Sequence, residues 1–130
     1  MRYLTEDEII EINHFVIEKY SPAEPVGLVQ PKVLNMIVEN PKQDVFGKEL
    51  YPTLIEKSAN IYKNLVQKHI FINGNKRTAF LAMKTFLAFN GYALKVGTDE
   101  AVDFTVKIAK KSLQDKEISE WIEVHLNEIK

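Results

Sequence analysis

Residues 79–89 read AFLAMKTFLAF, and this run decides the fold that the sequence predicts. Nine of its eleven residues are apolar, and only Lys84 and Thr85 are not. A helix that is apolar nearly all round is usually buried at the centre of a domain. Asn90-Gly91 follows, and a glycine at this place is typical of a helix C-terminus. We therefore expect a buried helix over residues 76–90, with the rest of the chain packed around it.

The segments on either side of this run also have helical patterns. Thr5 and Glu8 form a capping box ahead of a stripe of isoleucines and valines that reaches about Tyr20. All five prolines lie in the first 52 residues, and a stretch without proline favours helices. The predicted fold class is all-α, a compact bundle of about six helices around a buried central helix. The expected helices are 6–20, 31–40, 52–68, 76–90, 98–112 (capped by Thr98) and 118–129, with a loop or short hairpin over 41–50 and an extended piece over 92–96.

The composition excludes several classes of protein. With 17 Lys and Arg against 18 Asp and Glu, the formal net charge is −1, so we expect no binding of DNA or anionic membrane by bulk charge. The chain has no cysteine, which excludes disulfides, thiolate metal sites and a cysteine nucleophile. The longest apolar run, Ala79–Met83, is too short to span a membrane, and the N-terminus has no signal-peptide core. We expect a single cytoplasmic domain over residues 1–130.

The start of the central helix breaks a rule that other helices of the chain keep. The helices expected after Thr5 and Thr98 carry acidic residues in their first turn, whereas the central helix carries Lys76 and Arg77 there. A cation at the positive end of a helix costs roughly 0.3–1 kcal/mol. Because local rules tend to be broken at functional sites, this helix end is a candidate site.

A bound anion would explain the two cations. The N-terminus of a helix offers free backbone N–H groups, and Gly74 would let the backbone come close to a ligand. Asn75 can cap the helix or donate to an oxygen, and Lys76 and Arg77 suit phosphate oxygens. Two cations and a helix end favour a polyphosphate over one carboxylate. A helix–loop–helix join with a glycine and two solvated cations is also common, so the residues alone leave both interpretations open.

The loop ahead of this helix end holds a candidate catalytic residue. His69 lies five to eight residues upstream of the candidate phosphate-binding residues, across a tight loop. An imidazole can accept a proton near neutral pH, so His69 can act as a general base, although a lone histidine is more often structural. Phe71 and Ile72 are expected to anchor the loop in the core.

Residues 69–77 follow the order H-x-F-x-N-G-N-K-R, which resembles the active-site signature of the Fic/Doc superfamily, H-x-F-x-[D/E]-G-N-[G/K]-R. The short chain, its helical pattern and the continuation K-R-T-A are similar to the Doc (death-on-curing) toxin branch, and weaker likeness extends over nearly the whole chain. The resemblance implies that His69 activates an acceptor hydroxyl, that Phe71 anchors the motif, and that nucleotide phosphates are bound by Gly74, Asn75, Lys76 and Arg77.

The resemblance also implies an activity and partners. Doc-type proteins are similar to kinases: they transfer the terminal phosphate of ATP, with Mg²⁺, to a hydroxyl of a translation elongation factor. They are toxins of toxin–antitoxin pairs and are neutralised by a small antitoxin protein. A flap ahead of the motif helix aligns the target peptide. Residues 43–50 are its best candidate here, with Val45, Phe46, Gly47 and Lys48 at its centre.

Two departures from the family pattern bear on activity. Asn73 stands where the family has the acid that holds Mg²⁺; its carbonyl can ligate the metal but brings no negative charge. Phe80 stands where the Fic motif has a second arginine, which fits the Doc branch better than AMP transfer. Two alternatives therefore stay open: a nucleotidyl (AMP) transferase of the Fic type, and a catalytically weakened module that binds a nucleotide or a partner.

Overall fold

The protein is described from a computed structural model, and the structure describes residues 1–129. Within these residues it is mostly helical, with two small antiparallel pairs of strands, which confirms the predicted fold class. The elements in chain order are α1 (Glu6–Tyr20), α2 (Pro31–Glu39), the 3₁₀ helix η1 (Asn40–Lys42), β1 (Asp44–Val45), β2 (Lys48–Glu49), α3 (Leu54–Gln67), α4 (Asn75–Phe89), β3 (Tyr92–Leu94), α5 (Thr98–Ala109), α6 (Asp115–Val124) and β4 (Leu126–Glu128).

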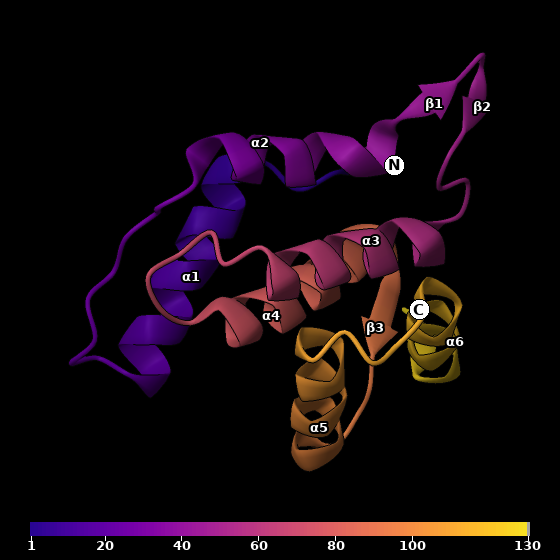
Figure 1. The fold of residues 1–130 in the computed structure, drawn as a ribbon. Helices are drawn as coiled ribbons and strands as arrows, with labels where there is room; N and C mark the ends of the chain where they lie inside the picture. The colour runs from indigo at the N-terminus through magenta and orange to yellow at the C-terminus, as the bar shows by residue number, and fades with distance from the viewer. Residues whose placement is uncertain (130) are drawn as a thin grey trace.

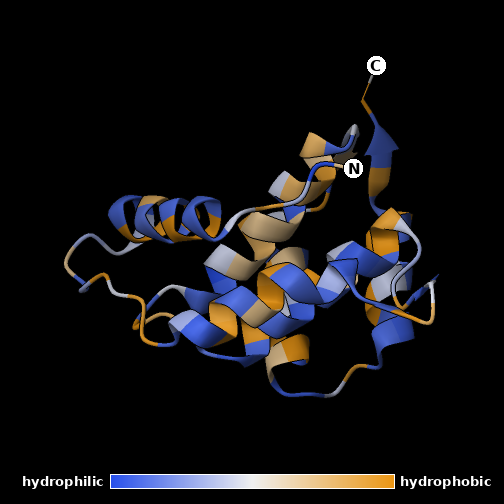
Figure 2. Ribbon diagram, turned by 90° about the horizontal axis from the view of Figure 1, so that it is seen from above, coloured by the Kyte–Doolittle hydropathy of each residue, from blue (hydrophilic) through white to orange (hydrophobic). Residues whose placement is uncertain are grey.

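The helices α3 and α4 lie side by side and are joined by the loop that carries the candidate site (Figure 1). Helices α1 and α2 lie on one side of this pair, and α5 and α6 lie on the other. The helices contain hydrophobic as well as hydrophilic residues, as expected for amphipathic elements around a common core (Figure 2). The largest fully buried apolar side chains of the central pair are Tyr62, Leu65, Met83, Phe86 and Leu87.

The prediction of a buried central helix is confirmed for α4. Ala79, Ala82, Met83 and Phe86 have no exposed surface at all. One stripe of α4 is less covered, since Phe89 keeps 41% of its surface exposed. Apolar residues nearly all round a helix thus correspond to a core-facing side and a second, partly open side.

The capping box predicted at the start of α1 is confirmed. The Thr5 hydroxyl accepts a hydrogen bond from the Glu8 backbone N–H at 3.2 Å, and the Glu8 carboxylate accepts one from the Thr5 backbone N–H at 2.9 Å. The predicted cap at Thr98 is wrong: Gly97 is the N-cap residue of α5 and Thr98 is its first helical residue. A threonine followed by Asp99 and Glu100 is compatible with the N-cap and with the first helical position, so the sequence does not distinguish the two.

The last predicted helix, 118–129, is wrong at both ends. It begins at Asp115, because Gln114 and Glu117 form a capping box there, and it ends at Val124. The next residues form β4, which pairs antiparallel with β3 in the register Tyr92↔Glu128 and Leu94↔Leu126. The extended piece predicted near residue 92 is thus confirmed as β3. Its backbone groups pair with those of β4, so residues 126–128 form a strand and not the end of a helix.

Residues 44–49 form a hairpin, one of the two conformations expected for the segment between Pro41 and Leu50. Asp44 pairs with Glu49 and Val45 with Lys48, which leaves a two-residue turn. Phe46 has φ +52° and Gly47 has φ +81°, the two positive values that a type I′ hairpin turn requires.

No helix among residues 1–129 is long and apolar enough to cross a membrane.

Candidate active site

The loop between α3 and α4 is held in place by the segment that follows α1. The Val29 N–H donates to the Ile70 carbonyl at 2.8 Å, and the Ile72 N–H donates to the Gly27 carbonyl at 2.9 Å. Leu28 and Phe71 form an isolated antiparallel bridge between these two bonds. Two irregular segments therefore satisfy each other's backbone groups, which gives the loop a defined shape without a regular sheet.

His69 lies just after the end of α3 in an unusual backbone conformation. Its φ is +48°, in the left-handed region that residues other than glycine seldom occupy. The amide of Gln30 donates to the carbonyls of Lys68 at 2.7 Å and of His69 at 3.0 Å, and these bonds hold the peptide in this conformation. The His69 side chain is exposed, and no hydrogen bond from its imidazole is found among the described residues. The ring is accessible to a substrate.

The N-terminus of α4 has free backbone donors. Its N-cap residue, Gly74, offers no side chain, and the first hydrogen bond within the helix runs from the Thr78 N–H to the Gly74 carbonyl at 2.9 Å. The backbone N–H groups of Asn75, Lys76 and Arg77 precede that bond and have no helical acceptor. The side chains of Lys76 and Arg77 are exposed, and within residues 1–129 neither forms an ion pair. The predicted phosphate-binding residues are therefore brought together at one helix end.

Gly74 is required here for a reason that the sequence did not show. Its φ is +76°, and a Cβ atom would lie 3.2 Å from Ile17 Cγ1 and 3.3 Å from Val16 Cγ2. The side of the glycine on which a Cβ atom would lie thus faces α1. The glycine lets α1 pack directly against the start of α4.

Two hydrogen bonds between Asn75 and Phe71 stabilise the loop. The Asn75 amide accepts from the Phe71 N–H at 3.0 Å and donates to the Phe71 carbonyl at 2.9 Å. This side chain is engaged with the loop, so Asn75 has its backbone N–H left to offer a ligand. Phe71 is buried, as predicted for the motif anchor, but Ile72 is half exposed and the expectation for it was wrong. Ile70, fully buried, is the second anchor.

Asn13 is a residue of this site that the sequence reasoning missed. It is fully buried, and its amide donates to the Asn73 carbonyl at 2.9 Å and to the Thr78 hydroxyl at 3.1 Å. These bonds tie the end of the loop and the first turn of α4 to α1. The signal was present in the sequence, because Asn13 lies four residues after Ile9 on the core-facing stripe, where a polar side chain needs a partner.

Asn73 is used by the structure as a hydrogen-bond donor. Its amide nitrogen donates to the Pro25 carbonyl at 3.0 Å, a bond that an ionised aspartate cannot make. Residues 1–129 contain no group of three His, Asp or Glu side chains able to hold a metal ion. Asn73 could offer Mg²⁺ one neutral oxygen, and Mg²⁺ usually takes one or two carboxylates besides phosphate oxygens. The residues present do not fit a magnesium site held by the protein.

The hairpin that contains Val45, Phe46, Gly47 and Lys48 is not brought beside His69. It projects from the molecule near the N-terminus of α3, whereas His69 follows the C-terminus of that helix (Figure 1). Phe46 is fully exposed at its tip, with a backbone conformation that is strained for an aromatic residue. Its role as a target-aligning flap remains a prediction.

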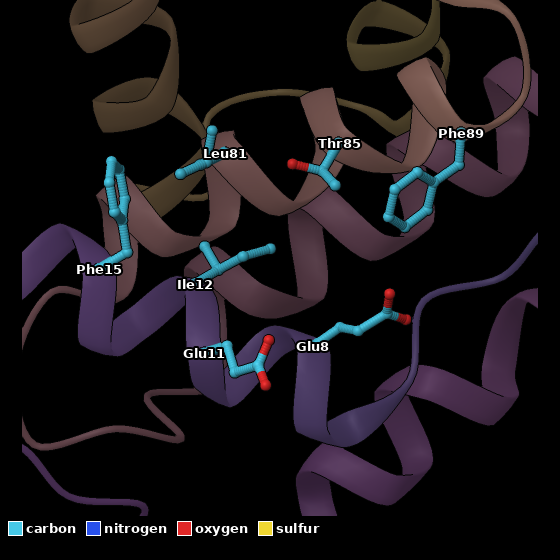
Figure 3. A pocket seen from close by; sticks show the side chains of 7 residues that line it. All are labelled: Glu8, Glu11, Ile12, Phe15, Leu81, Thr85 and Phe89. Carbon is cyan, nitrogen blue, oxygen red and sulfur yellow. The ribbon is translucent and has the colours of Figure 1, made fainter.

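A groove of about 310 Å³ lies between α1 and α4, outside the predicted site residues (Figure 3). Its walls are mainly apolar, and two carboxylates from α1 lie along one side. Phe15 keeps 51% of its surface exposed here. The lining residues are Glu8, Glu11, Ile12, Phe15, Leu81, Thr85 and Phe89.

The comparison with protein families decides where this arrangement belongs. Residues 3–87 match the Fic/DOC family, a stretch that runs from the capped start of α1 through the candidate site and most of α4. The chain belongs to the Fic/DOC family. It is similar to the Toxin Doc of Mycolicibacterium smegmatis, with 36% identity over 83 residues. This match covers 64% of the chain and 59% of that relative's length, and α5 and α6 lie outside the family match.

Proposed function

We propose that this protein is a nucleotide-dependent transferase that moves the terminal phosphate of ATP to a hydroxyl of a protein. The observation that supports the proposal is the start of α4, where an accessible His69 is followed by three free backbone N–H groups and by two cations that have no carboxylate partner among residues 1–129. Such a helix end suits the phosphates of a nucleotide. Membership of the Fic/DOC family, whose signature this loop carries, supports the same activity.

In the proposed reaction, the His69 imidazole takes the proton of the acceptor hydroxyl. The hydroxyl oxygen attacks the γ-phosphorus of ATP, the bond from this phosphorus to the β–γ bridging oxygen breaks, and ADP leaves. Lys76, Arg77 and the backbone N–H groups of α4 would neutralise charge on the phosphates. Catalysis would then depend mainly on position and electrostatics.

The acceptor we propose is a translation elongation factor, as in the Doc branch that the sequence resembles. The hairpin at residues 44–49 and His69 are at opposite ends of α3. A large protein partner would contact the hairpin while its acceptor hydroxyl lies near His69. The exposed Phe46 would supply an apolar contact on that surface.

The experiment uses ATP labelled at either the α or the γ phosphate, incubated with the protein and a cell lysate or a purified elongation factor. Transfer of the γ label alone is expected. Replacing His69 by Ala should slow transfer about 100- to 10,000-fold, the usual contribution of a general base. The matched control is His14→Ala, since His14 is also exposed but lies on α1. Transfer of the α label would favour the alternative of AMP transfer.

A catalytically weakened binding module is the second candidate function, and Asn73 is the observation that favours it. Calorimetry of ATP binding with and without Mg²⁺, together with the transfer assay, distinguishes the transferase from the binding module. Binding without any transfer to protein, unchanged by Asn73→Asp, would support the module.

We also propose a small antitoxin protein as partner, on the basis of the name of the similar Toxin Doc and of the groove between α1 and α4. The groove has an apolar floor and the Glu11 carboxylate on one side, whereas the Glu8 carboxylate is already paired with Arg2 at 2.6 Å. The groove would therefore suit an amphipathic helix with a basic residue beside its apolar face. Co-expression with the product of a neighbouring gene should give a complex. Failure of Phe15→Glu to weaken that complex would argue against this groove.

A further inference from the structure

The side chain of Arg77 is oriented by an aromatic ring of α1. The guanidinium carbon lies 4.5 Å from the centre of the Tyr20 ring. A guanidinium held at this distance from a ring is attracted by the π system. Arg77 makes no ion pair within the described chain, so the ring is the contact that restrains it.

This kind of contact leaves the hydrogen-bonding capacity of the arginine free. A carboxylate partner would use two of the five N–H donors and would neutralise the charge. A ring attracts the cation without accepting those donors strongly, and none of the hydrogen bonds found among residues 1–129 uses the Arg77 guanidinium. Arg77 is thus held near one place while its edge can still bind phosphate oxygens.

The Tyr20 side chain is 51% exposed, but the helix that carries it is fixed relative to the start of α4. It is the last residue of α1, whose preceding turn packs against Gly74 through Val16 and Ile17. One further turn back, Asn13 bonds to the loop and to Thr78. The end of α1 therefore forms one unit with the helix end that carries Arg77.

We propose that Tyr20 is a positioning residue for nucleotide binding, acting through Arg77. The inference rests on the proposed function, because it assumes that Arg77 binds nucleotide phosphates. Removing the ring should free the guanidinium and weaken binding, whereas keeping the ring without its hydroxyl should preserve binding. No hydrogen bond of the Tyr20 hydroxyl is found among residues 1–129.

The test measures the dissociation constant of a non-hydrolysable ATP analogue by calorimetry, with KM and kcat for ATP alongside. Tyr20→Leu should weaken binding about 2- to 30-fold, the range that one cation–π contact supports. Tyr20→Phe should bind as the unchanged protein does. The effect should appear in KM more than in kcat, which a general loss of folded protein would not produce.

A double-substitution cycle shows whether Tyr20 acts through Arg77. In the Arg77→Ala background, Tyr20→Leu should cause little further loss of affinity, since the arginine it holds is gone. Equal losses in both backgrounds, or full affinity in a folded Tyr20→Leu variant, would overturn the inference. If the unchanged protein does not bind the analogue at all, the proposed function fails and the inference fails with it. Binding that is unaffected by Tyr20→Leu overturns the inference alone.

Discussion

At the scale of single residues, Asn73 joins two segments that the family signature alone does not connect. Its amide holds the Pro25 carbonyl, and its own carbonyl accepts the Asn13 amide. The chain has a hydrogen bond where the family usually has a charge. The asparagine that replaces the family acid suggests a loss of activity, but it also provides a hydrogen bond between two segments of the chain.

Replacing Asn73 by Asp removes the hydrogen bond to Pro25 and adds the negative charge that the family usually has at this position. The carboxylate cannot donate to Pro25, so we expect the free energy of unfolding to fall by about 1 kcal/mol. The same charge should strengthen nucleotide binding in the presence of Mg²⁺ and not in its absence. Urea unfolding and calorimetry measure the two effects. Asn73→Ala serves as the control, because it loses the bond and gains no charge. A similar gain in affinity for both variants would contradict the role of charge.

At the scale of elements, the hairpin is anchored by a buried lysine of α3. The Lys57 side chain is 2% exposed, and its ammonium donates to the Pro41 carbonyl, to the Tyr51 carbonyl and to the Glu49 carboxylate. These acceptors lie on both sides of the hairpin turn. A single cation therefore satisfies groups at both ends of the segment and fixes its base.

Lys57→Met keeps the volume of the side chain and removes the ammonium. We expect the free energy of unfolding to fall by about 1–3 kcal/mol, because the acceptors lose a charged donor. The hairpin should also become more sensitive to limited proteolysis, which gel analysis of the cleavage sites would show. Lys84→Met, an exposed lysine on α4, is the matched control and should change stability little. Equal effects of both substitutions would argue against the anchor.

The helices were predictable where a local signal marked their ends. Thr5 with Glu8 marked the start of α1, and Asn90-Gly91 marked the end of α4. The strand β4 was not predictable in this way, because Leu126, Asn127 and Glu128 continue a helical pattern until β3 offers them partners. Tertiary pairing outweighs weak helix propensity over so short a segment.

At the scale of the whole molecule, the core joins α3, α5 and α6 through aromatic rings. Phe104 and Trp121 stack with ring centres 4.1 Å apart, and Tyr62 lies 6.4–6.5 Å from both. The hydroxyl of the fully buried Tyr62 forms a hydrogen bond with that of Thr105. Residues beyond the family match thus complete the core around the helix that leads into the site.

We expect the ionisation of Tyr62 to lower the stability of the whole molecule at alkaline pH. Burial raises the pKa of its hydroxyl to about 12 from an ordinary value of 10, an effect that the hydrogen bond with Thr105 partly opposes. Below pH 10 the hydroxyl is protonated in the folded and in the unfolded chain. Between pH 10 and 12 only the unfolded chain ionises, so the free energy of unfolding should fall, by on the order of 1 kcal/mol at pH 11.

Tyr62→Phe removes this contribution. Urea unfolding at pH 8 and pH 11 should show a smaller loss of stability for the variant than for the unchanged protein. All other ionisable groups are the same in the two proteins, so the comparison isolates the contribution of Tyr62. An equal loss in the two proteins would mean that Tyr62 does not control the alkaline limit.

The sequence by itself determined the central helix, the capped start of α1, and the line of residues from His69 to Arg77. These features rest on patterns within a few turns of chain, where spacing alone fixes which side chains share a face or a helix end. The tertiary structure decided what surrounds them: Gln30 at the His69 carbonyl, Asn13 and Pro25 at Asn73, and Tyr20 at Arg77. Such contacts join residues about 40 to 60 positions apart. They depend on packing across the core, which no local pattern records.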